Sequence, residues 1–99
     1  MTRRKVLTHP VALTEHVFDK IRSIGMALAE FEELLGGGEV IEEHEPEPGR
    51  LKELVLVVSW RRPLHVVVIV DVVRGEERIV TVYEPDPGGW SHDFRRRRR

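Results

Sequence analysis

Residues 51–84 of the chain read LKELVLVVSWRRPLHVVVIVDVVRGEERIVTVYE. Three segments of this stretch, 51–60, 64–73 and 78–84, are rich in β-branched residues, and the turn-like sequences RRP and RGEE separate them. The middle segment is apolar along nearly its whole length, which is typical of a central strand covered on both faces. Strand alternation divides it into one face with Leu64, Val66, Val68, Val70 and Val72 and another with His65, Val67, Ile69 and Asp71. The stretch therefore predicts an antiparallel meander.

Upstream of the meander, residues 14–35 predict two helices in a hairpin. Thr14 suits the N-cap of the first helix, and Gly25 suits its end. The sequence GGG at 36–38 is expected to terminate the second helix. Apolar residues recur at helical spacing in both: Val17, Phe18, Ile21 and Ile24, then Leu28, Phe31, Leu34 and Leu35.

Between the helices and the meander, EVIEE at 39–43 predicts a further strand. HEPEPGR at 44–50 predicts an exposed loop, because its two prolines cannot donate hydrogen bonds to a sheet. We expect a single domain over 1–99, with a loop, a short C-terminal helical turn and a basic tail in 84–99. The predicted fold class is α+β, with an N-terminal helical hairpin packed on a three- to four-stranded antiparallel sheet.

The charges are unevenly distributed along the chain. The formal net charge is -1, yet residues 95–99 are five arginines, and residues 1–94 carry 11 Lys and Arg against 17 Asp and Glu. Residues 30–47 include eight acidic residues and no Lys or Arg. An anionic polymer would be repelled by that segment and attracted to the basic ends of the chain.

Composition excludes several classes of site. The chain has no cysteine, which excludes disulfides, thiolate metal sites and a cysteine nucleophile. Asn and Gln are also absent, a bias that resembles proteins of thermophiles. The N-terminus fits no secretory signal and the longest apolar run is too short for a bilayer, so we expect a cytoplasmic protein. The histidines show no metal-ligand spacing and no glycine-rich phosphate loop is present, so we expect no metal and no other cofactor.

Several polar residues remain that could carry chemistry. His16 and Lys20 lie four residues apart on one predicted helix, and a base, an acid and cations together are what metal-free RNA cleavage requires. Each group also has a structural interpretation, such as a core histidine, a polar helix face or the cover of a sheet edge. The complete candidate set is His16, Lys20, His65 and Tyr83 as proton-transfer or catalytic groups, with Arg61, Arg62, Arg95, Arg96 and Arg97 as nucleic-acid-binding groups.

Specific motifs connect the chain with a family. PLHVV at 63–67, TVYEPDPGGWSHDFR at 81–95 and the helix HVFDKIRSIGM at 16–26 resemble domain-of-unknown-function family 4258, small bacterial and archaeal proteins, over about residues 13–97. That family is in turn similar to RelE/ParE/MqsR-type toxins, and its members often neighbour zinc-finger antitoxins. Two arginines of the family's helix pattern are Lys20 and Ile24 in this chain.

The resemblance implies a metal-independent ribonuclease toxin of a toxin–antitoxin pair, with RNA or the ribosome and an antitoxin protein as partners. It implies that His16 transfers a proton, that Lys20 and the arginines at 95–97 hold the phosphate, and that His65 or Tyr83 is the second proton-transfer group.

The family pattern also gives the end of the chain a structural part. Trp90 and Phe94, at positions i and i+4, are expected to pin a final helical turn to the sheet. Only Arg98 and Arg99 would then be a free tail.

Two alternatives belong to other functional classes. The lost helix arginine at position 24 and the neighbouring acidic segment favour a non-catalytic module that binds a partner protein, or a homodimer formed through an exposed strand edge. Plain nucleic-acid binding through the basic ends is the third interpretation, and it predicts a steep dependence of affinity on salt.

Overall fold

The meander predicted from residues 51–84 lies at the centre of the protein. The computed structural model describes residues 2–98, which form two helices and six strands. The protein is therefore an α+β fold, and its four long strands form an antiparallel meander, as predicted. In chain order the elements are β1 (Arg3–Arg4), β2 (Val11–Leu13), α1 (Glu15–Ser23), α2 (Leu28–Leu35), β3 (Glu39–Glu47), β4 (Arg50–Val57), β5 (Leu64–Asp71) and β6 (Glu76–Tyr83).

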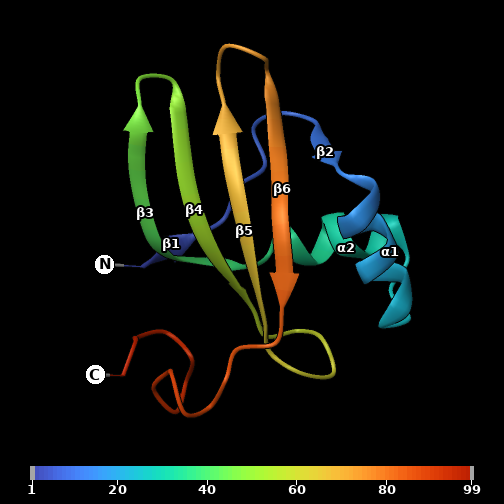
Figure 1. Ribbon diagram of the computed structural model, residues 1–99, viewed down its shortest axis with the longest axis vertical. Helices are drawn as coiled ribbons and strands as arrows, with labels where there is room; N and C mark the ends of the chain where they lie inside the picture. Colours follow the sequence, from blue (N-terminus) through green and yellow to red (C-terminus); the bar gives the residue numbers. More distant parts are fainter. Residues whose placement is uncertain (1, 99) are drawn as a thin grey trace.

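The sheet is larger than predicted, and it is mixed. Its strand order is β1-β3-β4-β5-β6-β2, and β2 runs parallel to β6, so the prediction of a three- to four-stranded antiparallel sheet is wrong. The two additional strands have two and three residues, too few for an alternating pattern to mark them in the sequence. They form because the N-terminal chain crosses from one edge of the sheet to the other (Figure 1).

The predicted N-terminal helical hairpin is also wrong. Two strands precede α1, and each helix packs separately on the sheet, α1 beside β6 and α2 beside β4. Val17 and Ile21 of α1 and Phe31 and Leu35 of α2 enter the same hydrophobic cluster. The link between the helices is anchored there too, because Met26 is 3% exposed. Of the residues described, no helix is long and apolar enough to cross a membrane.

The predicted helix ends are confirmed. Thr14 is the N-cap of α1, and its side-chain oxygen accepts a hydrogen bond from the backbone N–H of Val17 at 3.2 Å. Gly25 follows the helix with a φ of 80°, the left-handed conformation that favours glycine at a helix end. Helix α2 ends at Leu35, immediately before the three glycines.

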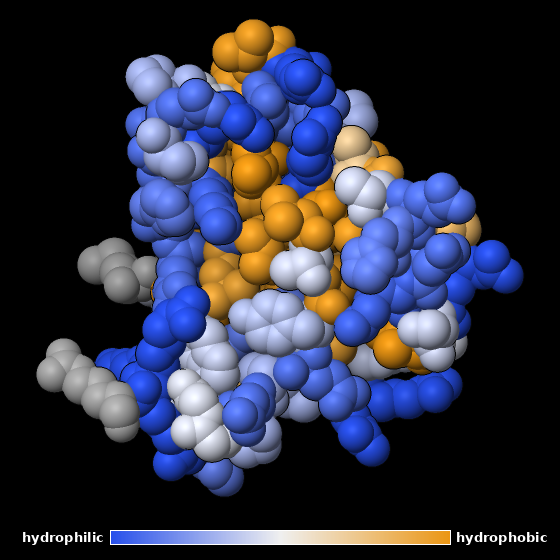
Figure 2. Space-filling model, viewed as in Figure 1, coloured by the Kyte–Doolittle hydropathy of each residue, from blue (hydrophilic) through white to orange (hydrophobic). Residues whose placement is uncertain are grey.

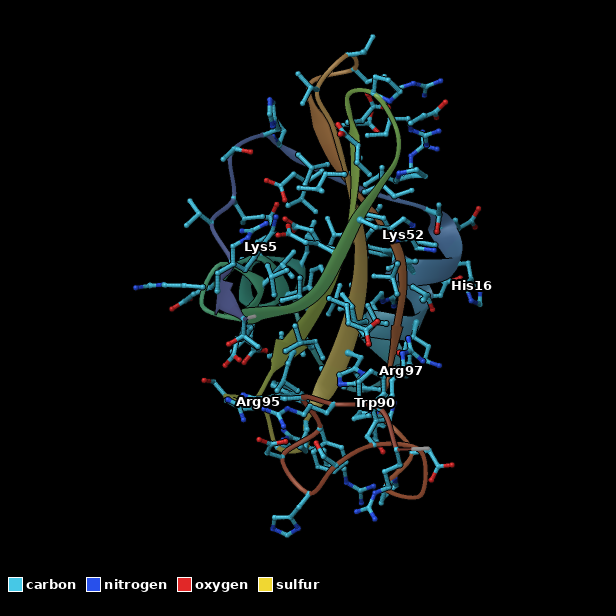
Figure 3. The ribbon with its side chains drawn as sticks, turned by 90° about the vertical axis from the view of Figure 1, so that its left-hand side faces the viewer. Lys5, His16, Lys52, Trp90, Arg95 and Arg97 are labelled. Atoms are coloured by element: carbon cyan, nitrogen blue, oxygen red, sulfur yellow. The ribbon has the colours of Figure 1, made fainter. Side chains whose placement is uncertain are left out.

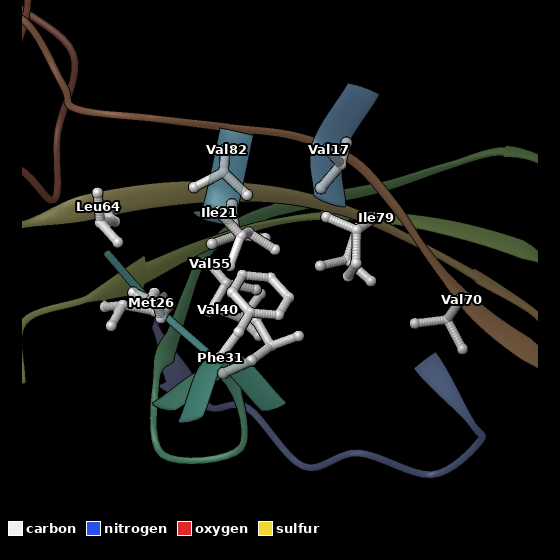
Figure 4. Packing of buried hydrophobic residues seen from close by; sticks show 14 residues of the cluster. Val17, Ile21, Met26, Phe31, Val40, Val55, Leu64, Val70, Ile79 and Val82 are labelled. Atoms are coloured by element: carbon white, nitrogen blue, oxygen red, sulfur yellow. The ribbon is translucent and has the colours of Figure 1, made fainter. Parts of the chain in front are cut away.

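Alternating side chains of the meander form two hydrophobic clusters on opposite faces of the sheet. The larger cluster lies beneath the helices and includes Leu64, Val66, Val68 and Val70 of β5, as the alternation predicted (Figure 4). Val72 lies beyond the end of the strand and is 62% exposed, so its predicted place on that face is wrong. The smaller cluster, on the opposite face, consists of Ile41, Leu54, Leu56 and Trp90, with Val67 and Phe94 packed against it.

Residues 44–47 form part of β3, although the sequence predicts a loop there. The prolines are tolerated because β1 pairs with β3 only at Val40 and Glu39. The outer edge of the rest of β3 has no strand beside it among the described residues, so Pro46 removes no hydrogen bond of the sheet. The turn to β4 is shorter than expected and contains Gly49, whose φ is 83°.

The C-terminal segment (residues 84–98) contains no helix, so the predicted helical turn is wrong. Its end folds back on itself instead: the N–H of Ser91 donates to Arg96 O at 2.7 Å, and the N–H of Arg98 donates to Gly89 O at 3.0 Å. Phe94 lies at the bend with a φ of 63°. An isolated bridge pairs Trp90 with Arg97 within the segment, and the indole of Trp90 packs against Ile41, Leu54 and Leu56 of the sheet. Arg99 lies outside the described residues.

The N-terminal crossing is held by a buried ion cluster on the helix side of the sheet. Lys5 is 1% exposed and forms ion pairs with Glu53 of β4, at 2.8 Å, and with Glu77 of β6. Arg3 also reaches Glu53, and the N–H of Thr8 donates to Glu77 at 2.6 Å. Because the two carboxylates belong to different strands, one lysine ties the crossing chain to the middle and to the far side of the sheet.

Replacement of Lys5 by methionine is expected to destabilise the protein by about 3–5 kcal/mol, because it leaves buried carboxylates without their central counter-charge. Arg4→Met is the matched control, since Arg4 is an exposed neighbour of Lys5 on the same segment. Urea unfolding measures both. Equal stability of the two variants would show that the ion cluster does not hold the crossing.

A second expected outcome concerns the passage from α2 into β3. A Cβ atom on Gly38 would lie 2.7 Å from Val55 Cγ1 and 3.0 Å from the backbone oxygen of Leu56, whereas one on Gly37 would have no neighbour closer than 3.8 Å. Gly38→Ala is therefore expected to cost about 1–3 kcal/mol through overpacking, and Gly37→Ala much less. A Gly38→Ala protein that unfolds at the urea concentration of Gly37→Ala contradicts this packing.

Candidate functional site

The face of the sheet opposite the helices, here termed the helix-free face, carries side chains in regular rows across β3, β4, β5 and β6. Cross-strand register defines the rows. The first row contains Glu39, Leu56, His65 and Tyr83, the second Glu42, Leu54, Val67 and Thr81, and the third His44, Lys52, Ile69 and Arg78.

The C-terminal segment covers the first row and leaves most of the other two open. Trp90 and Phe94 pack against Ile41, Leu54 and Leu56, which closes one end of the face. Val67 and Ile69, in the middle of the second and third rows, remain partly exposed. Figure 2 shows this face as an apolar floor with hydrophilic surface on both sides. The opening is therefore bordered by β3 on one side and by β6 and α1 on the other (Figure 1).

His65 fastens the C-terminal segment to the first row. It is fully buried, its Nε2 lies 2.9 Å from the carbonyl oxygen of Phe94, and its Nδ1 lies 3.3 Å from the hydroxyl of Tyr83. Because a carbonyl oxygen only accepts, Nε2 carries the proton and Nδ1 accepts one from the tyrosine. The ring of Trp90 meets the imidazole edge-on, with centroids 4.3 Å apart. Burial lowers the pKa of His65, which favours this neutral form.

The terminal arginines are bound to the acidic strand β3. Arg95 forms a two-pronged ion pair with Glu39, with Nε to Oε2 and Nη2 to Oε1 both at 2.9 Å. Arg97 donates from Nε and Nη2 to Glu42 at 2.9 and 3.1 Å, and its guanidinium stacks on Trp90 at 4.8 Å from the ring centroid. Hydrogen bonds from Arg95 lower the pKa of Glu39. The basic end of the chain is thus partly neutralised by the segment whose acidity was noted in the sequence.

A shallow pocket of about 180 Å³ lies in the open part of the helix-free face. Leu54 and Val67 form its apolar floor. His44 and Lys52 face each other across β3 and β4 on one side, and Tyr83 and Arg97 lie toward the C-terminal segment. Lys52 and Arg97 project from the same side of the protein in Figure 3. The pocket therefore combines an imidazole, an ammonium, a phenol and a guanidinium with the carboxylates of Glu42 and Glu53 around an apolar surface.

The structure brings together some of the residues predicted from the sequence. Tyr83 and Arg97 line the pocket, and buried His65 contacts Tyr83 from behind. Arg95 is turned toward Glu39 and lines a different hollow, together with exposed Arg96. Burial raises the pKa of Tyr83, so its phenol keeps its proton at neutral pH.

Four other predicted residues lie elsewhere. His16 and Lys20 are exposed on α1 and do not line the pocket. Figure 3 shows His16 extending outward from the helix. Arg61 and Arg62 are exposed in the loop between β4 and β5, where Arg61 stacks on Trp60 and Arg62 lies 3.4 Å from Glu84.

Sequence reasoning missed His44 and Lys52. Lys52 alternates with Leu54 and Leu56 on the same face, which is the available signal. For His44 no such signal exists, and the prolines after it led to a loop prediction that removed it from the sheet. Neither residue has a hydrogen-bond or ion-pair partner among the described side chains. Within residues 2–98, no group of three or more His, Asp or Glu side chains is placed to hold a metal ion.

Comparison with known proteins gives one result. The family model described as Domain of unknown function (DUF4258) matches residues 13–84. No curated protein and no solved structure matches the chain. The matched region runs from the end of β2 to just past β6. It includes His44, Lys52 and Tyr83, and it ends before Trp90 and the arginines at 95–97. The finer resemblance to RelE/ParE/MqsR-type toxins is not confirmed.

The buried, neutral His65 is expected to make stability depend on pH. Its folded-state pKa is below the ordinary 6.5, so the unfolded chain binds the proton more tightly and stability falls as pH drops below 6.5. His65→Gln keeps an N–H donor and an oxygen acceptor but cannot titrate, and we expect it to flatten this loss. The difference between the two proteins is at most about 1.4 kcal/mol per pH unit.

Urea unfolding of both proteins between pH 5 and pH 8 measures the effect. Titration of the other histidines cancels in the comparison. Parallel pH profiles would show that the buried imidazole is not held neutral.

Proposed function

The chain belongs to the DUF4258 family, and from the pocket of this member we propose that it binds single-stranded RNA on the helix-free face and cleaves it without a metal ion. One observation carries the proposal: His44, Lys52, Tyr83 and Arg97 surround a single apolar-floored pocket. These are the four side-chain types expected for the reaction, with His44 and Lys52 in the places that the sequence assigned to His16 and Lys20.

The open face suits an RNA strand because it offers two kinds of contact. Leu54 and Val67 give an apolar surface for a base, and the phenol ring of Tyr83 lies beside them. Lys52 and Arg97 are cations for the phosphate backbone. A base and its phosphate can therefore be held together on one rigid sheet, which is better suited to orienting a reacting group than a mobile loop.

Cleavage follows from the proton-transfer groups. His44 takes the proton of the ribose 2′-hydroxyl, and the 2′-oxygen attacks the phosphorus. The bond from phosphorus to the 5′-oxygen breaks, and the Tyr83 hydroxyl turns from His65 Nδ1 toward that oxygen and gives it the proton, so that it leaves as a hydroxyl. Lys52 and Arg97 stabilise the charge of the phosphorane. The products are a 2′,3′-cyclic phosphate and a 5′-hydroxyl end, and solvent returns the protons.

We assign His65 to positioning. It is fully buried and has no route to a substrate, but its Nδ1 accepts from Tyr83 while its Nε2–H holds Phe94, next to the arginines. The acid and the arginine-bearing segment are thus oriented by one side chain. Burial raises the pKa of Tyr83, so the phenol holds a proton at neutral pH but releases it less readily than an exposed tyrosine does.

Arg97 reaches the pocket through an ion pair that a substrate can replace. Its partner Glu42 is 39% exposed and lies on the rim of the same pocket. Exposed ion pairs contribute little net stability, so a phosphate can substitute for the carboxylate at low cost. We further propose that an antitoxin-type partner protein restrains the enzyme by covering the helix-free face, where it would exclude RNA or a ribosome-bound message.

A second candidate is a non-catalytic module that binds a partner protein through the same face. The observation in its favour is that Arg95 and Arg97 are already paired with Glu39 and Glu42. Homodimerisation through a strand edge is less favoured. The outermost strands are very short, and the open part of β3 carries Glu43, Glu45 and Pro46, which oppose edge-to-edge pairing.

The test is cleavage of a labelled oligoribonucleotide in EDTA, with the product ends identified. His44→Ala and Tyr83→Phe are each expected to lower the rate about 10²–10⁴-fold, as for the loss of a general base or acid. His92→Ala, which removes an exposed histidine of the C-terminal segment, is the matched control and is expected to cleave normally. Wild-type protein that neither binds nor cleaves RNA supports the second candidate, and binding without cleavage leaves plain nucleic-acid binding. Loss of cleavage in His16→Ala with retention in His44→Ala would place the site on α1.

A further inference from the structure

A second polar hollow lies on the helix-free face, at the tips of the β3–β4 and β5–β6 hairpins. It has a volume of about 310 Å³, and Arg50, Arg74 and Arg78 line it together with Glu47 and Asp71. The two hairpin tips are joined, since the N–H of Val72 donates to the carbonyl oxygen of Gly49 at 2.9 Å. Three arginines from two hairpins are therefore held around one cavity by backbone as well as by side chains.

The nearly buried carboxylate of Asp71 organises the arginines. Its Oδ2 lies 3.6 Å from Arg50 Nε and 3.9 Å from Arg74 Nε, and its Oδ1 accepts from the backbone N–H of Arg74 at 3.0 Å. Glu47 binds Arg50 Nη1 at 2.6 Å, and Glu76 binds Arg78 Nε at 3.1 Å. The carboxylates thus orient the guanidinium groups and do not use up their donors.

Several guanidinium N–H groups have no acceptor among the described residues. Arg50 Nε is buried and makes no hydrogen bond, because its ion-pair partner, Asp71 Oδ2, lies 3.6 Å away. The side chains of Arg74 and Arg78 contact carboxylates only through Nε, so both of their terminal amino groups have no acceptor within residues 2–98. A buried donor without an acceptor is uncommon in a folded protein and points to a missing ligand. The lining of the cavity carries a net formal charge of +1, which favours an anion.

Cross-strand register places this hollow beside the pocket described above. Arg78 shares the third row with His44 and Lys52, and Arg50 lies one step further along β4. We propose that the arginine cluster of Arg50, Arg74 and Arg78 is a phosphate subsite that holds an RNA strand one or more nucleotides away from the pocket. The inference rests on the proposed RNA-binding function. It adds the path of the RNA across the helix-free face, between the C-terminal segment and the hairpin tips.

Guanidinium groups suit this task because their planar fork can bind two phosphate oxygens at once. A strand long enough to span both sites gains contacts that a dinucleotide seated in the pocket lacks. Length dependence is therefore the signature of the subsite. It is absent if the cluster only stabilises the hairpin tips.

The experiment measures binding of 5′-fluorescent 2′-O-methyl oligouridylates by anisotropy, because a 2′-O-methyl strand cannot be cleaved. The variant is Arg74→Gln/Arg78→Gln, whose side chains are 64% and 43% exposed, so Arg50 and the buried Asp71 stay paired. The control, Arg4→Gln/Arg22→Gln, removes the same charge from exposed positions outside both hollows.

We expect the variant to bind the hexanucleotide at least tenfold more weakly at low salt than the control does, with dinucleotide binding unchanged. The slope of log K against log salt is expected to fall by about 1.4, at about 0.7 for each lost phosphate contact. Equal hexanucleotide affinity and slope in variant and control overturn the subsite. The subsite is also overturned if calorimetry shows that the wild-type hollow binds inorganic pyrophosphate while the substitutions leave hexanucleotide binding unaffected.

The two proposals fail separately. If wild-type protein never cleaves RNA but the variant loses hexanucleotide affinity, the subsite stands and the catalytic proposal falls. If wild-type protein cleaves a dinucleotide and the variant binds the hexanucleotide like the control, the catalytic proposal stands and the subsite falls.

Discussion

The buried pairing of Lys5 with Glu53 and Glu77 is the constraint on which the architecture depends. A charged lysine is placed inside a sheet protein only when counter-charges meet it there, and here the two carboxylates come from β4 and β6. The pairing draws the N-terminal chain across the helix side of the sheet, so that β1 and β2 complete opposite edges. With two helices and this crossing on one face, only the other face is left for contact with a substrate or partner.

The use of that other face is set by the C-terminal segment. Trp90 and Phe94 provide the apolar contact, His65 provides the polar one, and the arginine pairs with Glu39 and Glu42 align the end of the chain along β3. The uneven charge of the sequence is thereby explained, because the basic end of the chain forms ion pairs with the acidic strand β3. What stays open is a band of the sheet with an apolar floor, bounded by the C-terminal segment at one end and by the arginine cluster of Arg50, Arg74 and Arg78 at the other.

The candidate site shows how far residue types can be predicted without positions. Histidine, lysine, tyrosine and arginine were the expected side chains, and Tyr83 and Arg97 do line the pocket, but the histidine and the lysine there are His44 and Lys52. Helical spacing drew attention to His16 and Lys20 because the two share one helix face. The pairing of His44 with Lys52 joins two strands across a turn, and its register depends on a turn position that the prolines obscured.

Local rules written in the sequence determined the strands of the meander, the faces of β5, the N-cap at Thr14 and the glycine ends of both helices, because each depends on neighbours within a few residues. Only the tertiary structure decided the rest: the edge strands of two and three residues, the folded-back C-terminal segment and the capture of Arg95 and Arg97 by β3. The edge strands and the arginine pairs join residues about 35 to 66 positions apart, and such contacts leave no periodic trace in a single chain. For the same reason the five arginines could be read as a free basic tail from the sequence, whereas in the folded protein the carboxylates of β3 hold two of them.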